Sequence, residues 1–189
     1  MAEYPFNVLE GRSPSGIPIV RFIENVPEFM KQDNAETKLV IETLQQVHNE
    51  LAKIEGRLTR LKESIKDTIP EIEENLEVIA FSRTKESEGP VRTNYQVSAS
   101  IFAEADLDQA AGKVVLWLGA NTAAELTFDE AEKLLKENLS KKQERLKTCV
   151  EDLKFTKAQI TTTEVSIARV YNNDVKERRA KRDAEESSA

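Results

Sequence analysis

Two interleaved columns of apolar residues constrain the fold of this chain more than any other feature. Members of the first column are seven residues apart, and each member of the second follows one of the first by three: Leu44, Leu51, Leu58 and Ile65, with Val47, Ile54 and Leu61. Alternating spacings of three and four place one apolar stripe on a helix, and such a stripe requires a partner helix. We therefore predict a first helix over residues 33–87, opened by a cap at residues 33–36 and stopped by Gly89-Pro90. Pro70 predicts a local change of packing within it, because proline removes a backbone hydrogen bond.

A second stripe with the same spacing supplies the partner helix. It follows Thr127-Phe128-Asp129-Glu130, a capping box whose hydroxyl and carboxylate satisfy free backbone N–H groups. This predicts a second helix over residues 128–180 and a disordered tail over residues 183–189. Folded back on the first, it forms a long antiparallel two-helix coiled coil in a single domain, residues 33–182. The predicted coiled-coil core is Leu51, Ile54, Leu58, Leu61, Ile65, Leu139, Leu146, Cys149, Leu153 and Ile160.

The helical pattern is interrupted over residues 92–127, where we predict two β-hairpins. Residues 95–107 alternate with period two, which indicates a half-buried strand or two strands sharing a bend. Residues 114–118 are apolar on both faces, as in a central strand, and Gly119-Ala120-Asn121 predicts a tight hairpin turn. The fold class is therefore mostly α with a small β region.

Two small hairpins with apolar faces and open edges are marginal alone. We therefore expect the β region to be a platform for assembly with other subunits. The predicted oligomer interface consists of Tyr95, Val97, Ala99, Ile101, Val114, Leu116, Trp117, Leu118 and Leu126.

Four of the six prolines fall within residues 1–32, which predicts an irregular or extended N-terminal arm with one short helical turn around Phe29. Its apolar side chains are placed to reach the free end of the coiled coil. They are Ile17, Ile19, Val20 and Phe22.

Composition bears on the class of function. The formal net charge of −7 disfavours a nucleic-acid partner. One cysteine and one histidine provide neither a disulfide nor a Cys/His zinc site, and no catalytic constellation is present. We therefore expect no enzyme activity, metal or cofactor. With no apolar run of about 18 residues, we expect no membrane span and a cytoplasmic location.

Three further features have plain structural interpretations. His48 follows an apolar position on a charged helix, which favours a surface histidine over a ligand, and Cys149 in the stripe is interpreted as a small buried thiol. The basic cluster over residues 176–182 is interpreted as a solvated helix end. A localisation signal or nucleic-acid contact there stays open, and with it a nuclear location.

Several segments resemble the α-class subunits of the prefoldin family. KVVLWLGANTAAELTFDEAEKLLKENL is similar to the family's central strand, its Gly-Ala-Asn turn and the start of its second helix, and IPEIEENLEVI to the end of its first. FIENVPEFM and TTTEVSIARVYNNDVKERR extend the resemblance, which covers residues 16–180. It implies a heterohexamer with one further α-class and four β-class subunits, whose hairpins assemble into an intersubunit β-barrel.

The resemblance also implies a chaperone function without ATP. In this family, non-native actin and tubulin are held between coiled-coil tips and passed to the cytosolic chaperonin. Holding a non-native chain requires exposed, weakly specific apolar groups. The predicted client-binding tip is Val40, Ile41, Leu44, Ile167, Val170, Tyr171 and Val175.

Two alternatives accompany these predictions. Val40 and Leu44 are spaced to share the helix seam, so Ile41 is the better client contact, and the same side chains could instead close the tip or pack the arm. The second alternative is a coiled-coil structural tether or scaffold without chaperone activity, which explains the helices but not the strands.

Overall fold

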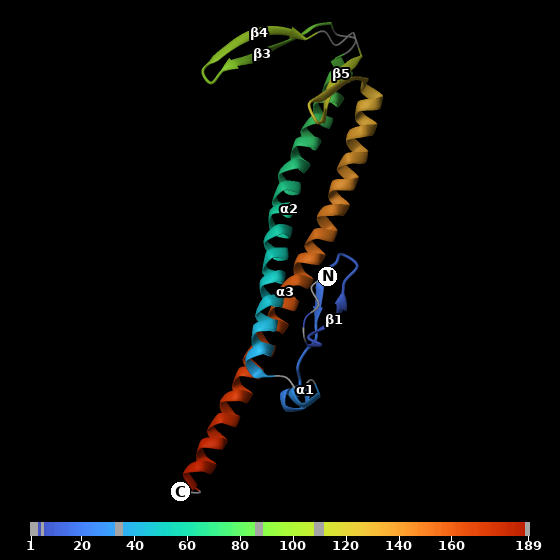
Figure 1. The fold of residues 1–189 in the computed structure, drawn as a ribbon. Coiled ribbons are helices and arrows are strands. Elements are labelled where there is room, and N and C mark those ends of the chain that lie inside the picture. Colours follow the sequence, from blue (N-terminus) through green and yellow to red (C-terminus); the bar gives the residue numbers. More distant parts are fainter. Residues whose placement is uncertain (1–3, 5, 33–35, 86–88, 108–111, 188–189) are drawn as a thin grey trace. The chain divides into compact units, whose positions relative to one another are not determined.

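The computed structural model describes all residues except 1–3, 5, 33–35, 86–88, 108–111 and 188–189. Two long helices, α2 (Thr37–Lys85) and α3 (Phe128–Ser187), make the chain mostly helical (Figure 1). The chain divides into two compact units. We name residues 1–62 with 148–189 the helix-end unit, and residues 63–147 the hairpin unit.

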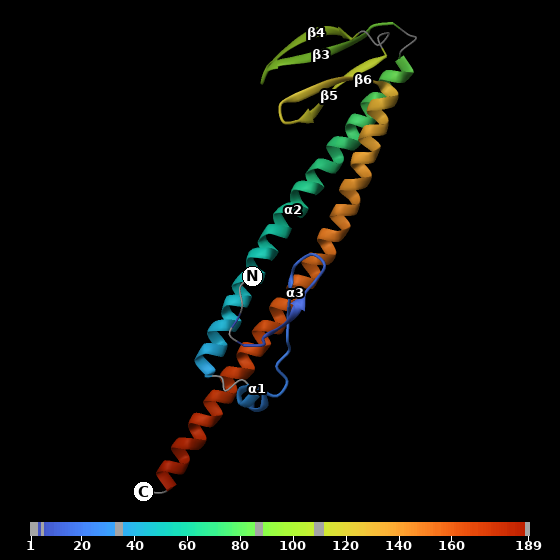
Figure 2. The same ribbon diagram turned by 45° about the vertical axis from the view of Figure 1, so that its right-hand side comes forward.

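In the helix-end unit, α2 and α3 run side by side in opposite directions (Figures 1 and 2). His48 Nε2 lies 3.2 Å from Glu164 Oε1, and Lys157 Nζ lies 3.7 Å from Glu55 Oε1. The residue number rises along α2 as it falls along α3. Of the predicted coiled-coil core, four residues are buried, namely Leu51, Ile65, Cys149 and Leu153, and the other six are partly buried.

The seam between the helices also contains hydroxyl side chains. Thr156, Thr163 and Ser166 have no exposed surface. Each hydroxyl donates to the carbonyl oxygen four residues earlier on α3, at 2.7–2.9 Å. The hydrogen bonds of these three hydroxyl groups are therefore made within α3, and the groups require no partner across the seam.

The N-terminal arm contains two short strands and a short helix. Strand β1 (Leu9–Arg12) pairs antiparallel with β2 (Pro18–Val20), and α1 (Val26–Gln32) follows. The turn between the two strands contains Gly16, which has a positive φ of 79° and whose N–H donates to Ser13 O at 2.8 Å. Glycine adopts such a backbone conformation without steric cost. The predicted cap at residues 33–35 lies outside the described residues.

The hairpin unit contains both expected hairpins. Strand β3 (Val91–Ser98) pairs with β4 (Ile101–Leu107), so residues 95–107 form two strands rather than one. Strand β5 (Lys113–Gly119) pairs with β6 (Thr122–Thr127) through the predicted turn, in which Ala120 and Asn121 both have positive φ, 49° and 58°. Positive φ at both central residues matches the right-handed twist of the strands.

The ends of the long helices in the hairpin unit follow the sequence signals. Helix α2 continues through Pro70 and ends at Lys85. Thr127 N donates to Glu130 Oε2 at 3.0 Å and Glu130 N donates to Thr127 Oγ1 at 3.3 Å, which confirms the capping box. The Thr127 hydroxyl also donates to Glu130 Oε2, at 2.9 Å, and the two hydrogen bonds that this carboxylate accepts from the backbone and hydroxyl of Thr127 lower the pKa of Glu130.

At its other end, α3 extends to Ser187, further than predicted. Residues 183–187 are therefore helical rather than a disordered tail. Pairs spaced by four support the extension, with Arg178 Nε 2.9 Å from Asp174 Oδ2 and Arg182 Nε 3.9 Å from Glu186 Oε1. The basic cluster over residues 176–182 is thus part of a helix with local acidic partners.

Candidate assembly and client-binding surfaces

The β5–β6 hairpin has an inner face that packs on its own chain. Val114, Leu116 and Leu126 contact a core of α2 and α3 side chains and are partly buried. That core is formed by Ile72, Ile79, Phe128, Ala131 and Leu135. These three residues of the predicted oligomer interface therefore already have apolar partners within the hairpin unit, and their part in assembly stays a prediction.

The outer face of the same hairpin is apolar and open. Trp117 is 72% exposed and Val115 is 64% exposed. Leu118, at the turn end of β5, is exposed as well. Lys113 Nζ lies 2.6 Å from Glu125 Oε1 at the base of this face. The hydrogen bond and charge of Glu125 raise the pKa of Lys113.

The β3–β4 hairpin carries a second exposed apolar group. Tyr95, Val97 and Ile101 are all at least 59% exposed, and Ala99 lies exposed in the turn. Phe102, opposite Gln96 in the register, is equally exposed. Exposed aromatic and branched side chains on two short hairpins are typical of a surface that another protein chain covers.

Two exposed residues of this surface are absent from the predicted interface. Phe102 interrupts the alternation of residues 95–107, and Val115 shares its face with Trp117 by period two. The signal for Val115 was therefore present in the sequence. The exposure of Phe102 could not be predicted from the alternation, which this residue interrupts. It requires the register of the hairpin, that is, which residues pair across the two strands.

In the helix-end unit, the arm covers much of the predicted client-binding tip. Val40, Leu44 and Val170 have no exposed surface. They share one core with arm residues Val8, Ile17, Val20, Ile23, Val26 and Phe29. These three tip residues therefore pack the arm, as the plainer alternative expected, and are not accessible to a client in this structure.

Polar contacts hold the arm in place. Tyr4 Oη donates to Glu50 Oε2 at 2.7 Å, and Arg12 Nη2 lies 3.0 Å from Glu50 Oε1. Val20 N donates to Gln159 Oε1 at 2.7 Å. Arg169 Nη1 donates to Ile23 O at 3.4 Å, and its guanidinium lies over the ring of Phe22, 4.6 Å from the ring centre. Both long helices therefore bind the arm.

The accessible part of the predicted tip lies around a groove of about 580 Å³. It is lined by Ile41, Gln45, His48, Asn49, Glu164, Ile167, Ala168 and Tyr171. Tyr171 is 58% exposed, whereas Ile41, Ile167 and Val175 are partly buried. His48 belongs to this groove and contacts Glu164, so it is a partly exposed helix residue as expected.

Cys149, possible metal sites and possible membrane spans were the other features considered from the sequence. Cys149 is buried and its Sγ lies 3.3 Å from Leu58 O. Among the described residues, no group of three or more His, Cys, Asp or Glu side chains is placed to hold a metal ion. No described helix has a stretch both long and apolar enough to cross a membrane.

Several curated proteins are similar to this chain in sequence over most of its length. The family model for prefoldin subunits matches residues 50–173. Prefoldin subunit 3 of Mus musculus is 40% identical over 92% of this chain and 89% of its own length. Prefoldin subunit 3 of Saccharomyces cerevisiae is 34% identical over 97% and 96%. A chain of filamentous PFD from Methanocaldococcus jannaschii matches with a TM-score of 0.41 and 19% identity, covering 60% of this chain and 94% of that one.

Proposed function

This chain belongs to the prefoldin subunit family, and we propose that it acts as the subunit 3 member of a heterohexameric chaperone. Its partners would be one further α-class and four β-class subunits. The exposed apolar surface of the hairpin unit carries the proposal, above all Trp117 at 72% exposure. Burying such surface stabilises an assembly by about 25 cal/mol per Å² before the costs of association.

In the proposed architecture, each subunit contributes a two-helix coiled coil and its β-hairpins to a barrel shared by the subunits. Helices α2 and α3 form an antiparallel coiled coil, and the β3–β4 and β5–β6 hairpins join those of neighbouring subunits in an intersubunit β-barrel. The observed packing supports different roles for the two faces of the β5–β6 hairpin. The inner face of β5–β6 fixes the hairpin to its own helices, whereas the outer face and β3–β4 remain for neighbours.

The proposed activity is ATP-independent, non-enzymatic capture of non-native proteins such as actin and tubulin, and their delivery to the cytosolic chaperonin. This places the protein in the cytoplasm. Ile41, Ile167, Tyr171 and Val175 are the proposed client contacts, because the arm leaves them at least partly accessible. Weakly specific holding fits an open groove better than an enclosed pocket.

A mixing experiment tests assembly. The full chain is combined with the complete set of candidate β-class subunits and the further α-class subunit, and the mass in solution is measured by light scattering. A hexamer is the expected species. A chain that takes up none of the partners would contradict the proposal and favour the structural tether or scaffold.

A further inference from the structure

A groove in the helix-end unit concentrates positive charge on a chain that is acidic overall. Its volume is about 520 Å³, and it is lined by Arg12, Gly16, Glu50, Lys53, Ile54, Arg57 and Arg60. The arm contributes the first two residues and α2 the others. The described lining thus has four basic side chains and one acidic side chain, while the chain as a whole has a net charge of −7.

Glu50, the one acidic side chain among the described residues that line this basic groove, is already engaged. Glu50 accepts hydrogen bonds from Tyr4 Oη at 2.7 Å and from Arg12 Nη2 at 3.0 Å. Burial alone would raise the pKa of the Glu50 carboxyl. The two hydrogen bonds and the charge of Arg12 outweigh that effect and lower the pKa. Glu50 therefore stays ionised at neutral pH and neutralises Arg12.

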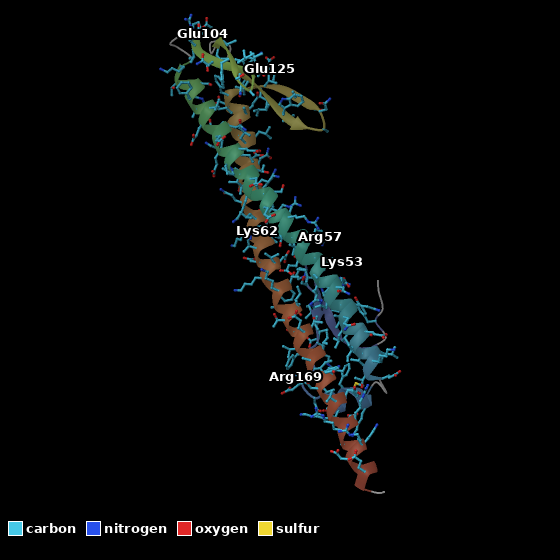
Figure 3. The ribbon with its side chains drawn as sticks, turned by 90° about the vertical axis from the view of Figure 1, so that its left-hand side faces the viewer. Lys53, Arg57, Lys62, Glu104, Glu125 and Arg169 are labelled. Atoms are coloured by element: carbon cyan, nitrogen blue, oxygen red, sulfur yellow. The ribbon has the colours of Figure 1, made fainter. Side chains whose placement is uncertain are left out.

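The other basic side chains of the groove lie along one side of α2. Lys53, Arg57 and Arg60 follow spacings of four and three, which places them on a single helical stripe. Figure 3 shows Lys53 and Arg57 extending from the same side of the helix. All three are exposed, and among the described residues no carboxylate lies within ion-pair distance of any of them. Their charge is available to a partner.

From this geometry we propose that the basic groove binds a short acidic segment of a partner protein. From Lys53 to Arg60 the helix rises by seven residue steps, about 10 Å, which matches roughly three residues of extended peptide. Carboxylates of such a segment would pair with Lys53, Arg57 and Arg60. Ile54, partly buried between them, provides contact for one apolar side chain of the segment.

A nucleic acid fits this groove less well than a peptide. None of the described residues that line the groove is aromatic, whereas binding of single strands relies on stacking bases on aromatic residues. A long polyanion would also meet the net negative charge of the rest of the chain. A short acidic peptide carries fewer charges and gains from Ile54. The groove is formed within the helix-end unit of one chain, so binding there does not depend on assembly with other subunits.

Fluorescence anisotropy on the full chain tests this proposal. The probe is a short fluorescein-labelled peptide of Asp and Glu around a central leucine, and the comparison peptide has Asn and Gln in place of the acids. We expect saturable, salt-sensitive binding of the acidic probe alone. Lys53→Glu with Arg57→Glu should weaken it about tenfold or more, and Lys53→Gln with Arg57→Gln by a smaller factor.

The control pair is Lys147→Glu with Lys154→Glu, which changes the net charge equally at exposed positions of α3. It should change the affinity less than about twofold. Equal weakening by both pairs would mean bulk attraction only and would overturn the proposal. So would tighter binding of a single-stranded oligonucleotide. Self-association of the chain that the Lys53/Arg57 pair abolishes would make a second copy the occupant and also overturn it.

Discussion

Tyr4 donates a 2.7 Å hydrogen bond to Glu50 and thereby ties the start of the arm to the middle of the helix-end unit. The same carboxylate accepts from Arg12 on β1, so one side chain of α2 holds two points of the arm. Apolar packing supplies the larger area, since arm residues such as Val8 and Ile17 are buried with the helix seam. The polar contacts fix where that apolar surface docks.

Glu50→Gln should loosen the arm without unfolding the helices. The amide retains a hydrogen-bond acceptor for Tyr4 but loses the charge that pairs with Arg12, at a cost of about 1 kcal/mol. Hydrogen exchange should accelerate in β1 and β2 and stay unchanged in α3 beyond Val175. Glu10→Gln, at an exposed arm position, is the matched control. Equal exchange in the two variants would show that Glu50 does not hold the arm.

Docking of the arm should depend on pH at both extremes. Burial and the hydrogen bond to Glu50 raise the pKa of Tyr4 from 10.0 to about 12, so its contribution is complete below pH 10 and is lost as the pH rises toward 12. The pKa of Glu50 is lowered from 4.5, so its contribution is complete above that value and is lost as the pH falls below it. Proteolysis of the arm across pH measures both limits. In Tyr4→Phe, the arm should no longer loosen through this group as the pH rises toward 12. Loosening at the same alkaline pH in this variant would assign the effect to another group.

Val115→Asp with Trp117→Asp should prevent assembly while leaving the subunit folded. Both side chains are exposed, so aspartate costs little in the isolated chain but would place an unpaired charge in a subunit interface. We expect loss of the hexamer by light scattering and an unchanged helical circular dichroism signal. Val150→Asp makes a similar change at an exposed apolar position outside the hairpins and should leave assembly intact. A hexamer that tolerates the first pair would place the interface elsewhere.

The inner face of the same hairpin should respond differently. Val114→Asp with Leu116→Asp puts carboxylates against a core that includes Ile79 and Phe128, at a cost of about 2–4 kcal/mol in folding stability. The isolated chain should therefore unfold at lower temperature, unlike the Val115/Trp117 variant. Thermal melts followed by circular dichroism separate the two faces. Equal melting temperatures for the two variants would contradict the assignment of an inner face.

The helices were predictable because their signals are local. The columns from Leu44 to Ile65 and the capping box at Thr127 depend only on spacings of three or four residues, and α2 and α3 follow them. The tight turn at Ala120 was predictable for the same reason. The side of the strand on which Val114 packs could not be predicted, because a strand that is apolar on both faces does not show which face its own helices cover.

The strand pairing of the arm could not be predicted because it depends on tertiary contacts. A three-residue strand such as Pro18–Val20 has no periodicity of its own and is stable only against the helix seam. The same packing buries Val40, Leu44 and Val170, whose spacing alone is equally compatible with an open tip. The position of the arm therefore determines which tip residues remain for a client.

Deleting residues 1–32 tests that relationship between the arm and the tip. Without the arm, Val40, Leu44 and Val170 lose apolar neighbours, and the exposed surface should bind a hydrophobic dye several-fold more strongly. If the tip holds clients, suppression of actin or tubulin aggregation by the assembled hexamer should persist or rise. It should then fall when Ile41→Ser and Tyr171→Ser are added, and Val165→Ser, at another exposed apolar position of α3, is the control. Suppression that is indifferent to all of these changes would exclude this end of the helices from client binding.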